Sequence, residues 1–284
     1  MNIIQAMKER RSVRSYDGNG ISDNQKEMLL KAAEEAYDPF GGKVTIRLKK
    51  FDLKAGYKPS TYGMISGAED FFMLAMGSDE VSALSAGFRF EQVVLKAWEM
   101  GLGTCWIAGT FKGSDFEKGE SWPAGEEVKV VCPVGVSKRP TMMEKFARFT
   151  LGSKNRKPFD ELFFSKDFTA PVAADNTFRE ALEMLRLSPS STNSQPWRAL
   201  TEGDSVHFYY KPKSKISDLD TAIGMAQFWE TEKFNGKSGR FHKVSDFPLP
   251  PEDWKYLYSY TRERDSPYSV SGSAAISSGS GSAI

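Results

Sequence analysis

The order of the predicted elements occurs twice along this 284-residue chain, and this repetition constrains the fold more than any single motif. Each time, an amphipathic helix is followed by a loop of turn-forming residues, a strand and a long buried helix. We interpret the repeated order as an internal duplication with halves at 1–155 and 156–262.

The first half contains the clearer periodic patterns. Ser22 and Gln25 have the spacing of a capping box at the start of a helix. Apolar residues alternate as in strands or recur at helical spacing in the segments that follow. The predicted elements are helices at 2–9, from residue 22 and at 87–103, and strands at 43–51, 68–77 and 127–136.

The second half is shorter. Thr177 and Glu180 predict another capping box, followed by a helix, a strand at 205–211 and a helix at 219–236. We find no clear counterpart of the strand at 127–136. Residues 263–284 form the last segment, rich in serine and glycine towards its end, which predicts a flexible tail or an artificial extension.

Composition limits the classes of protein that fit. The chain is 40% hydrophobic and 26% charged, with a net charge of +1, so bulk charge gives no reason to expect nucleic acid or an anionic membrane as a partner. Its two cysteines are too few for a disulfide framework, and no long apolar run is present. We therefore expect a reduced, cytoplasmic protein.

Two basic segments are candidate anion sites. "RRSVRSY" places Arg10, Arg11, Ser12 and Arg14 within five residues, and "SKNRK" contains Lys154 and Arg156. Arginine and serine suit a phosphate group, because guanidinium forks and a hydroxyl supply several charge-assisted hydrogen bonds. A solvated basic turn and a charged linker are the alternative interpretations.

Two further segments are candidate ligand-contacting loops. "GLGTCWIAG" at 101–109 is either a helix cap with a packed turn, or a backbone that glycine allows to approach a flat ring closely. "SPSSTNSQPW" at 188–197 is either an elaborate turn anchored by Trp197, or a loop that presents hydrogen-bonding groups to a ligand. The two histidines of the chain have no metal-ligand spacing, so we predict no metal site.

Together, "RRSVRSY", "GLGTCWIAG" and "PSSTNSQPW" resemble the FMN-dependent nitroreductase family, over about residues 2–262. That family forms homodimers with two FMN sites at the subunit interface, each built from the basic segment of one subunit and the serine-rich loop of the other. This chain keeps the basic segment only in its first half and the serine-rich loop only in its second. It is similar to a single-chain, two-repeat branch with one remaining FMN site. The resemblance therefore implies an α+β, nitroreductase-like fold in which two tandem half-repeats form an intramolecular pseudo-dimer.

The resemblance assigns a role to each matching residue. It implies that Arg10, Arg11, Ser12, Lys154 and Arg156 hold the phosphate, and that Arg14 lies near the ribityl chain and flavin O2. Pro189, Ser190, Ser191 and Asn193 would line the ring and the ribityl group. Trp106, Ile107, Ala108 and Gly109 would form the turn beside the flavin, with a backbone N–H of Ala108 or Gly109 near N5. Many relatives have an acidic residue where Ala108 stands.

The resemblance implies an oxidoreductase that takes hydride from NAD(P)H and reduces a nitroaromatic, a quinone or a related small-molecule acceptor by ping-pong turnover. No catalytic side chain is expected, because the hydride chemistry belongs to the flavin. Two alternatives stay open: a flavin-binding sensor or store with little turnover, and a structural pseudo-dimer that binds another phosphate ligand. A fused pair needs no second chain, so we expect a monomer.

Overall fold

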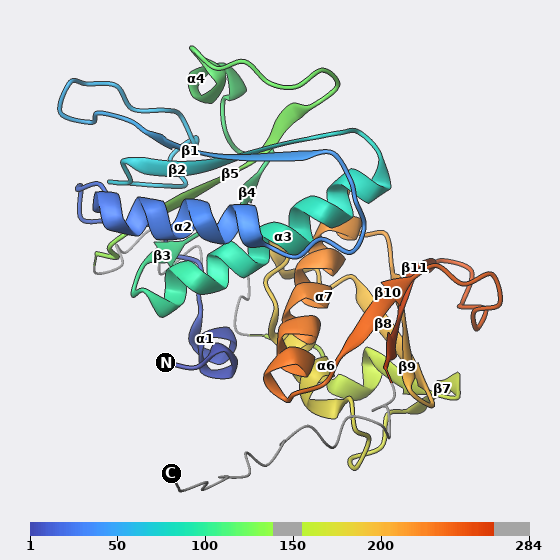
Figure 1. The fold of residues 1–284 in the computed structure, drawn as a ribbon. Helices are drawn as coiled ribbons and strands as arrows, with labels where there is room; N and C mark the ends of the chain where they lie inside the picture. The colour runs from blue at the N-terminus through green and yellow to red at the C-terminus, as the bar shows by residue number, and fades with distance from the viewer. Residues whose placement is uncertain (139–154, 264–284) are drawn as a thin grey trace, which may run out of the picture.

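Two β-sheets, one from each half of the chain, flank a pair of long helices (Figure 1). The computed structural model describes residues 1–138 and 155–263. Lys154 and almost the whole predicted tail therefore lie outside the described residues. In the part of the chain that is described, no helix is long and apolar enough to cross a membrane.

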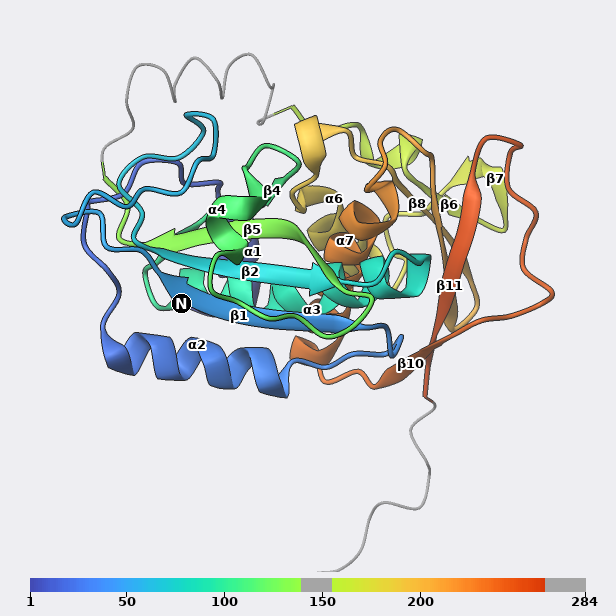
Figure 2. The same cartoon turned by 90° about the horizontal axis from the view of Figure 1, so that it is seen from above.

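The first sheet has the strand order β1-β2-β5-β3, with β4 also paired to β5, and every pair in it is antiparallel. Its strands are β1 (Val44–Lys50), β2 (Asp70–Met76), β3 (Gly103–Thr104), β4 (Ile107–Ala108) and β5 (Glu127–Gly135). All seven residues of β2 are buried, as expected for a central strand covered on both faces. Figure 2 shows α2 (Asp23–Glu35) running alongside β1, the edge strand of this sheet.

The second sheet has the order β10-β11-β9-β8-β6-β7, in which only the β6–β8 pair is parallel. Its strands are β6 (Phe163–Ser165), β7 (Asp167–Pro171), β8 (Trp197–Glu202), β9 (Ser205–Tyr210), β10 (Gly239–His242) and β11 (Lys255–Arg262). Strand β11 pairs antiparallel with β9, as β5 pairs with β2 in the first sheet. It is the counterpart strand that the sequence does not reveal, because a proline-rich segment separates it from the preceding helix.

The two long helices, α3 (Glu80–Glu99) and α7 (Ser217–Phe234), pack against each other between the sheets. They approach closely at Gly87, where a Cβ atom would lie 2.5 Å from the backbone oxygen of Leu219 and 3.0 Å from Cβ of Ala222. Any side chain at Gly87 would therefore push the helices apart. Helix α3 begins seven residues earlier than predicted because Asp79 caps it, accepting a hydrogen bond from the backbone N–H of Ser82.

The remaining helices are short or amphipathic: α1 (Ile3–Glu9), α4 (Gly113–Glu117) and α6 (Arg179–Leu187). The capping box of α2 is confirmed, with Ser22 and Gln25 bonded reciprocally. The one predicted from Thr177 and Glu180 is wrong. Asn176 instead accepts from the N–H of Phe178, and the Thr177 hydroxyl accepts from Arg262.

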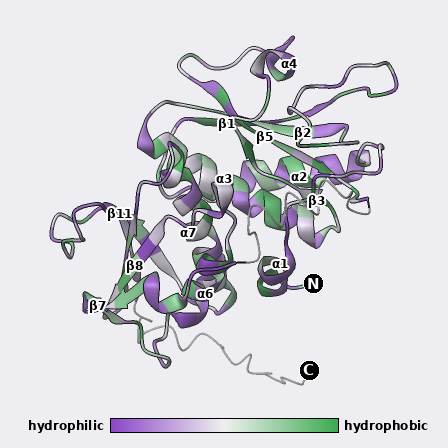
Figure 3. Ribbon diagram, turned by 180° about the vertical axis from the view of Figure 1, so that it is seen from behind, coloured by the Kyte–Doolittle hydropathy of each residue, from purple (hydrophilic) through white to green (hydrophobic). Residues whose placement is uncertain are grey.

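Helix α1 joins the two halves. Its apolar residues (Figure 3) pack on helices of both halves: Ile4 and Met7 form one cluster with Leu95 of α3 and Met184 of α6. The end of α1 therefore lies next to the end of α6, and these are the points at which "RRSVRSY" and "SPSSTNSQPW" begin.

Candidate functional site

The basic segment 10–16 runs along the edge of the first sheet. Ser12 forms a parallel bridge with Thr104 of β3, and the N–H of Val13 donates to the oxygen of Thr104 at 2.8 Å. Gly103 makes this contact possible, since a Cβ there would lie 2.6 Å from a methyl carbon of Val13. The segment is therefore fixed against the turn 101–109, which the sequence also singled out.

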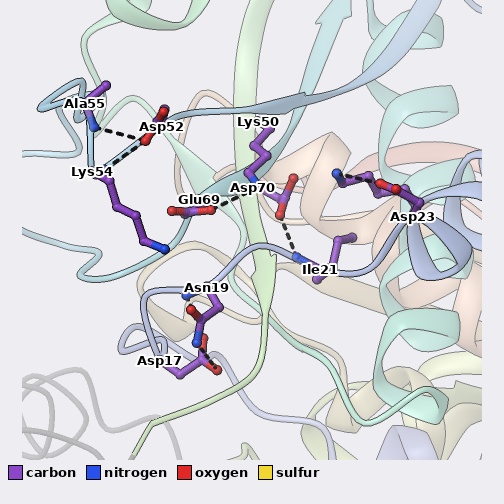
Figure 4. Close-up of polar contacts among 11 residues, drawn as sticks. Asp17, Asn19, Ile21, Asp23, Lys50, Asp52, Lys54, Ala55, Glu69 and Asp70 are labelled. Atoms are coloured by element: carbon purple, nitrogen blue, oxygen red, sulfur yellow. Dashed lines mark hydrogen bonds and ion pairs between the residues drawn. The ribbon is translucent and has the colours of Figure 1, made fainter.

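A second anchor holds the residues that follow the basic segment (Figure 4). The N–H of Ile21 donates to Oδ2 of Asp70 at 2.8 Å, where the carboxylate emerges from the buried start of β2. Burial raises the pKa of Asp70, and the hydrogen bond from Ile21 opposes this rise. With Asp17 and Asn19 closing a turn in between, the chain from Arg10 to Ile21 is held at both ends.

Arg10 is the C-cap residue of helix α1, and its N–H donates to the oxygen of Ala6 at 2.8 Å. Its Nη1 atom is buried and, among the residues that the structure describes, has no hydrogen-bond partner. Arg11 points elsewhere: its side chain lies over the ring of Trp98 at 5.7 Å, and the residue is exposed. Ser12 and Arg14 are half-buried.

The loop 188–196 has a tightly specified backbone. It forms a short 3-10 turn at Ser191–Asn193, and Thr192, Asn193 and Gln195 adopt positive φ angles of 50°, 55° and 49°. Residues other than glycine rarely adopt this conformation. It costs about 1–3 kcal/mol per residue, so it persists only where surrounding contacts offset that cost. Three such residues in one loop require strong anchors.

Side chains and backbone just after residue 154 supply one set of anchors. Arg156 donates from Nη1 to Oδ1 of Asn193 at 2.5 Å and from Nη2 to the oxygen of Leu187 at 2.9 Å. Nδ2 of Asn193 donates to the oxygen of Asn155 at 2.7 Å, and the N–H of Lys157 donates to Oε1 of Gln195 at 2.8 Å. Arg156 and Asn193, both predicted site residues, are thus in direct contact.

Asp220 of α7 supplies another anchor that sequence analysis missed. Its two carboxylate oxygens accept from the N–H of Ser191, each at 3.0 Å. Burial raises the pKa of Asp220 to about 7, against the opposing effect of that hydrogen bond. The first turn of α7 therefore fixes the predicted loop, through a carboxyl group that titrates near neutral pH.

Arg10 and Arg156 come from different halves of the chain and lie close enough for their charges to interact. The pKa of Arg156 is lowered to about 10, first by burial and then by the nearby charges of Arg10 and Arg186. Two guanidinium groups that repel each other in this way, one from each half of the chain, make a local cationic site in a protein with almost no net charge.

The turn at 106–109 forms the third part of the site. Ile107 is buried, Ala108 is half-buried and Gly109 is exposed with φ +80°. The indole of Trp106 packs edge-on against Phe90 and donates from Nε1 to Oε2 of Glu91 at 2.9 Å. Glu91, also missed from the sequence, is completely buried on α3 and lies within the electrostatic influence of Arg10.

The resemblance to FMN-dependent proteins predicts that Asn193→Ala weakens flavin binding about tenfold, because it removes the acceptor of Arg156 and one loop anchor. The matched control is Asp38→Ala in the corresponding loop of the first half, where Asp38 accepts from Phe40 and Ser85. That change should lower thermal stability and leave binding intact. Equal loss of binding in both variants, measured by flavin fluorescence titration, would contradict the assignment.

Comparisons with known proteins identify the family and the fold. The family model described as "Putative TM nitroreductase" matches residues 2–231. The crystal structure of a "putative nitroreductase" from Thermotoga maritima is 18% identical, covers 92% of this chain and 94% of its own, and has a TM-score of 0.58. At 18% identity, this match shows a similarity of fold alone. Among curated proteins, none matches the sequence.

Two further solved structures match about half of the chain. An FMN-dependent nitroreductase from Clostridium difficile is 19% identical, with 49% of this chain and 89% of that chain covered and a TM-score of 0.41. A "putative NADH dehydrogenase/NAD(P)H nitroreductase" from Bacteroides thetaiotaomicron is 20% identical, with coverages of 49% and 88% and a TM-score of 0.40. Because the family model covers most of the sequence, the chain belongs to the nitroreductase family and has its α+β fold.

Proposed function

We propose that this nitroreductase-family protein is an FMN-dependent oxidoreductase that takes hydride from NAD(P)H and reduces a nitroaromatic, a quinone or a related small acceptor. The observation that carries the proposal is the buried Nη1 of Arg10, which has no partner within the described residues and lies near the Arg156 guanidinium. Two neighbouring cations, one of which carries the buried donor, fit a phosphate dianion, which would relieve their repulsion. The names of the solved relatives support the choice of cofactor and donor.

Different residues would contact different parts of FMN. Arg10, Ser12 and Arg156 would bind the phosphate, and the loop that contains Ser190, Ser191 and Asn193 would contact the ribityl and ring groups. The backbone of the 106–109 turn would lie beside the ring. When bound, FMN supplies the hydride-transfer chemistry, and the chain supplies orientation and positive charge.

The experiment that tests the proposal is an absorbance spectrum of the purified protein after reconstitution with FMN, recorded under argon before and after NAD(P)H. We expect a bound flavin spectrum that bleaches on addition of the nicotinamide and returns on addition of the acceptor. A yellow protein that does not bleach would be a flavin-binding protein without turnover. A chain that takes up no FMN would overturn the proposal.

We also propose that the chain holds a single FMN site. In the first half, the segment that follows α2 corresponds to the loop that follows α6, but its aromatic side chains pack against other aromatic rings of the chain. Tyr37 stacks on Trp229 at 4.8 Å, and Phe40 packs edge-on against Phe88 at 5.5 Å and Tyr258 at 4.7 Å. In place of a second basic segment, the second half has β6 and β7.

The predicted stoichiometry is close to one FMN per polypeptide, because aromatic side chains fill the region beside the first-half loop. The measurement is flavin released by heat denaturation, divided by the protein concentration from amino-acid analysis. Sedimentation of the same sample determines whether the chain is a monomer, as we propose for a fused pair. Two flavins per chain would contradict the single-site interpretation.

A further inference from the structure

Glu91 is completely buried in the middle of α3, yet it carries two hydrogen bonds that lead in different directions. Oε2 accepts from Nε1 of Trp106 at 2.9 Å, at the start of the turn 106–109. Oε1 accepts from Nε2 of Gln227 at 2.7 Å, on α7 of the other half. Burying a carboxylate is costly, and these two hydrogen bonds offset part of that cost.

The Trp106 indole depends on this carboxylate. Its ring packs edge-on against Phe90 at 5.0 Å, and Glu91 is the acceptor for its N–H group. The residues that follow, Ile107 and Ala108, pair with β5. The strand pairing and the position of the indole therefore together fix the backbone at the start of the turn. Losing the acceptor would leave the N–H unpaired in an apolar cluster.

Helix α7 connects this network to the other wall of the site. Its first turn contains Asp220, which binds the N–H of Ser191 in the loop 188–196, and its middle contains Gln227, which binds Glu91. Both contacts start from one rigid helix. The serine-rich loop and the Trp106 turn are therefore held at a fixed separation, although they belong to different halves of the chain.

We propose that Glu91 is a positioning residue, which holds the Trp106 turn in register with the loop 188–196 through Gln227 and α7. The proposal rests on the proposed flavin site, since these two segments are its walls. Glu91 acts as a hydrogen-bond acceptor in this role. A glutamine at position 91 would keep one oxygen for the indole. Its NH2 group would donate to Oε1 of Gln227, a buried atom without a partner among the described residues, once the Gln227 amide turns over.

The test compares Glu91→Leu, Glu91→Gln, Trp106→Phe and the double variant Glu91→Leu with Trp106→Phe. We expect Glu91→Leu and Trp106→Phe each to raise the FMN dissociation constant about tenfold and to change the visible circular dichroism of bound flavin. The double variant should be no worse than either single variant. Glu91→Gln should stay within about threefold of the unmodified chain, because the acceptor for Trp106 survives.

The matched control is Glu232→Leu, which also removes a buried carboxylate, here on α7, bonded to Arg262 and remote in sequence from both walls. It should lower the unfolding temperature and leave the FMN dissociation constant unchanged. An equal rise in the dissociation constant for Glu91→Leu and Glu232→Leu would overturn the positioning role, as would a failure of Glu91→Gln to restore binding.

The cofactor-free chain separates this proposal from the proposed function. In it, Glu91→Leu should change the near-ultraviolet circular dichroism that Trp106→Phe also changes, while Glu91→Gln preserves it. If the chain binds no FMN but these spectra behave as stated, the flavin assignment fails and the Glu91–Trp106 link stands. If the Glu91→Leu spectrum equals that of the unmodified chain, the link itself is refuted.

Discussion

Replacing Arg10 and Ser12 together with alanine should weaken FMN binding by about 2–5 kcal/mol, or about 30- to 5,000-fold in the dissociation constant. Arg10 contributes a buried guanidinium nitrogen that has no protein partner within the described residues. Ser12 is fixed to Thr104 in the adjacent strand, so its position does not depend on Arg10. The loss should therefore come from missing contacts with the phosphate, and the fold should survive.

Arg47→Ala is the control for this double substitution. It also removes one positive charge, but this charge lies on β1 of the first sheet. There Arg47 stacks on Trp122 and forms an ion pair with Glu120. Fluorescence titration with FMN should give an unchanged dissociation constant for this variant. Full flavin retention by the Arg10 and Ser12 double variant after dialysis would remove the basis of the phosphate assignment. A separate Arg11→Ala variant tests whether that exposed residue contributes at all.

The unfolding free energy of this protein should fall as the pH rises from 5 to 8, and Asp220→Asn should remove about 2–3 kcal/mol of that fall. The pKa of Asp220 is raised from 3.8 to about 7 in the folded chain. Between these two values the folded state binds a proton that the unfolded state has released. This contribution to stability is therefore complete below about pH 4 and is lost as the pH passes 7.

Asparagine at position 220 keeps an oxygen that can accept from the N–H of Ser191 but does not titrate. The measurement is urea unfolding of both chains at several pH values. Asp167→Asn is the control: Asp167 is exposed and its pKa is lowered by hydrogen bonds from Thr169, so its contribution changes only at more acidic pH. Parallel pH profiles for the unmodified chain and Asp220→Asn would show that Asp220 does not hold the proton.

Local patterns predicted most of the elements correctly. Periodicity is a short-range property, so the capping box of α2, the buried strand β2 and the stripe of α3 at Phe90, Val93 and Val94 could be recognised from neighbouring residues alone. Strand β11 could not, because its place in the sheet depends on pairing with β9 across a long intervening segment. The capping box at Thr177 failed because a tertiary contact with Arg262 occupies its hydroxyl.

The residues of the candidate site divide in the same way. The sequence by itself determined the nitroreductase-type segments, because such motifs consist of neighbouring residues, and it proposed Arg10, Arg156 and Asn193 as site residues. Only the tertiary structure decided which residues support them. In the sequence, Asp220 and Glu91 are acidic residues of predicted helices with nothing to distinguish them. They anchor the site because the packing of α3 and α7 buries their carboxyl groups beside N–H donors that need an acceptor. Burial and contacts between the two halves depend on how residues far apart in the sequence pack together, so a local sequence pattern cannot predict them.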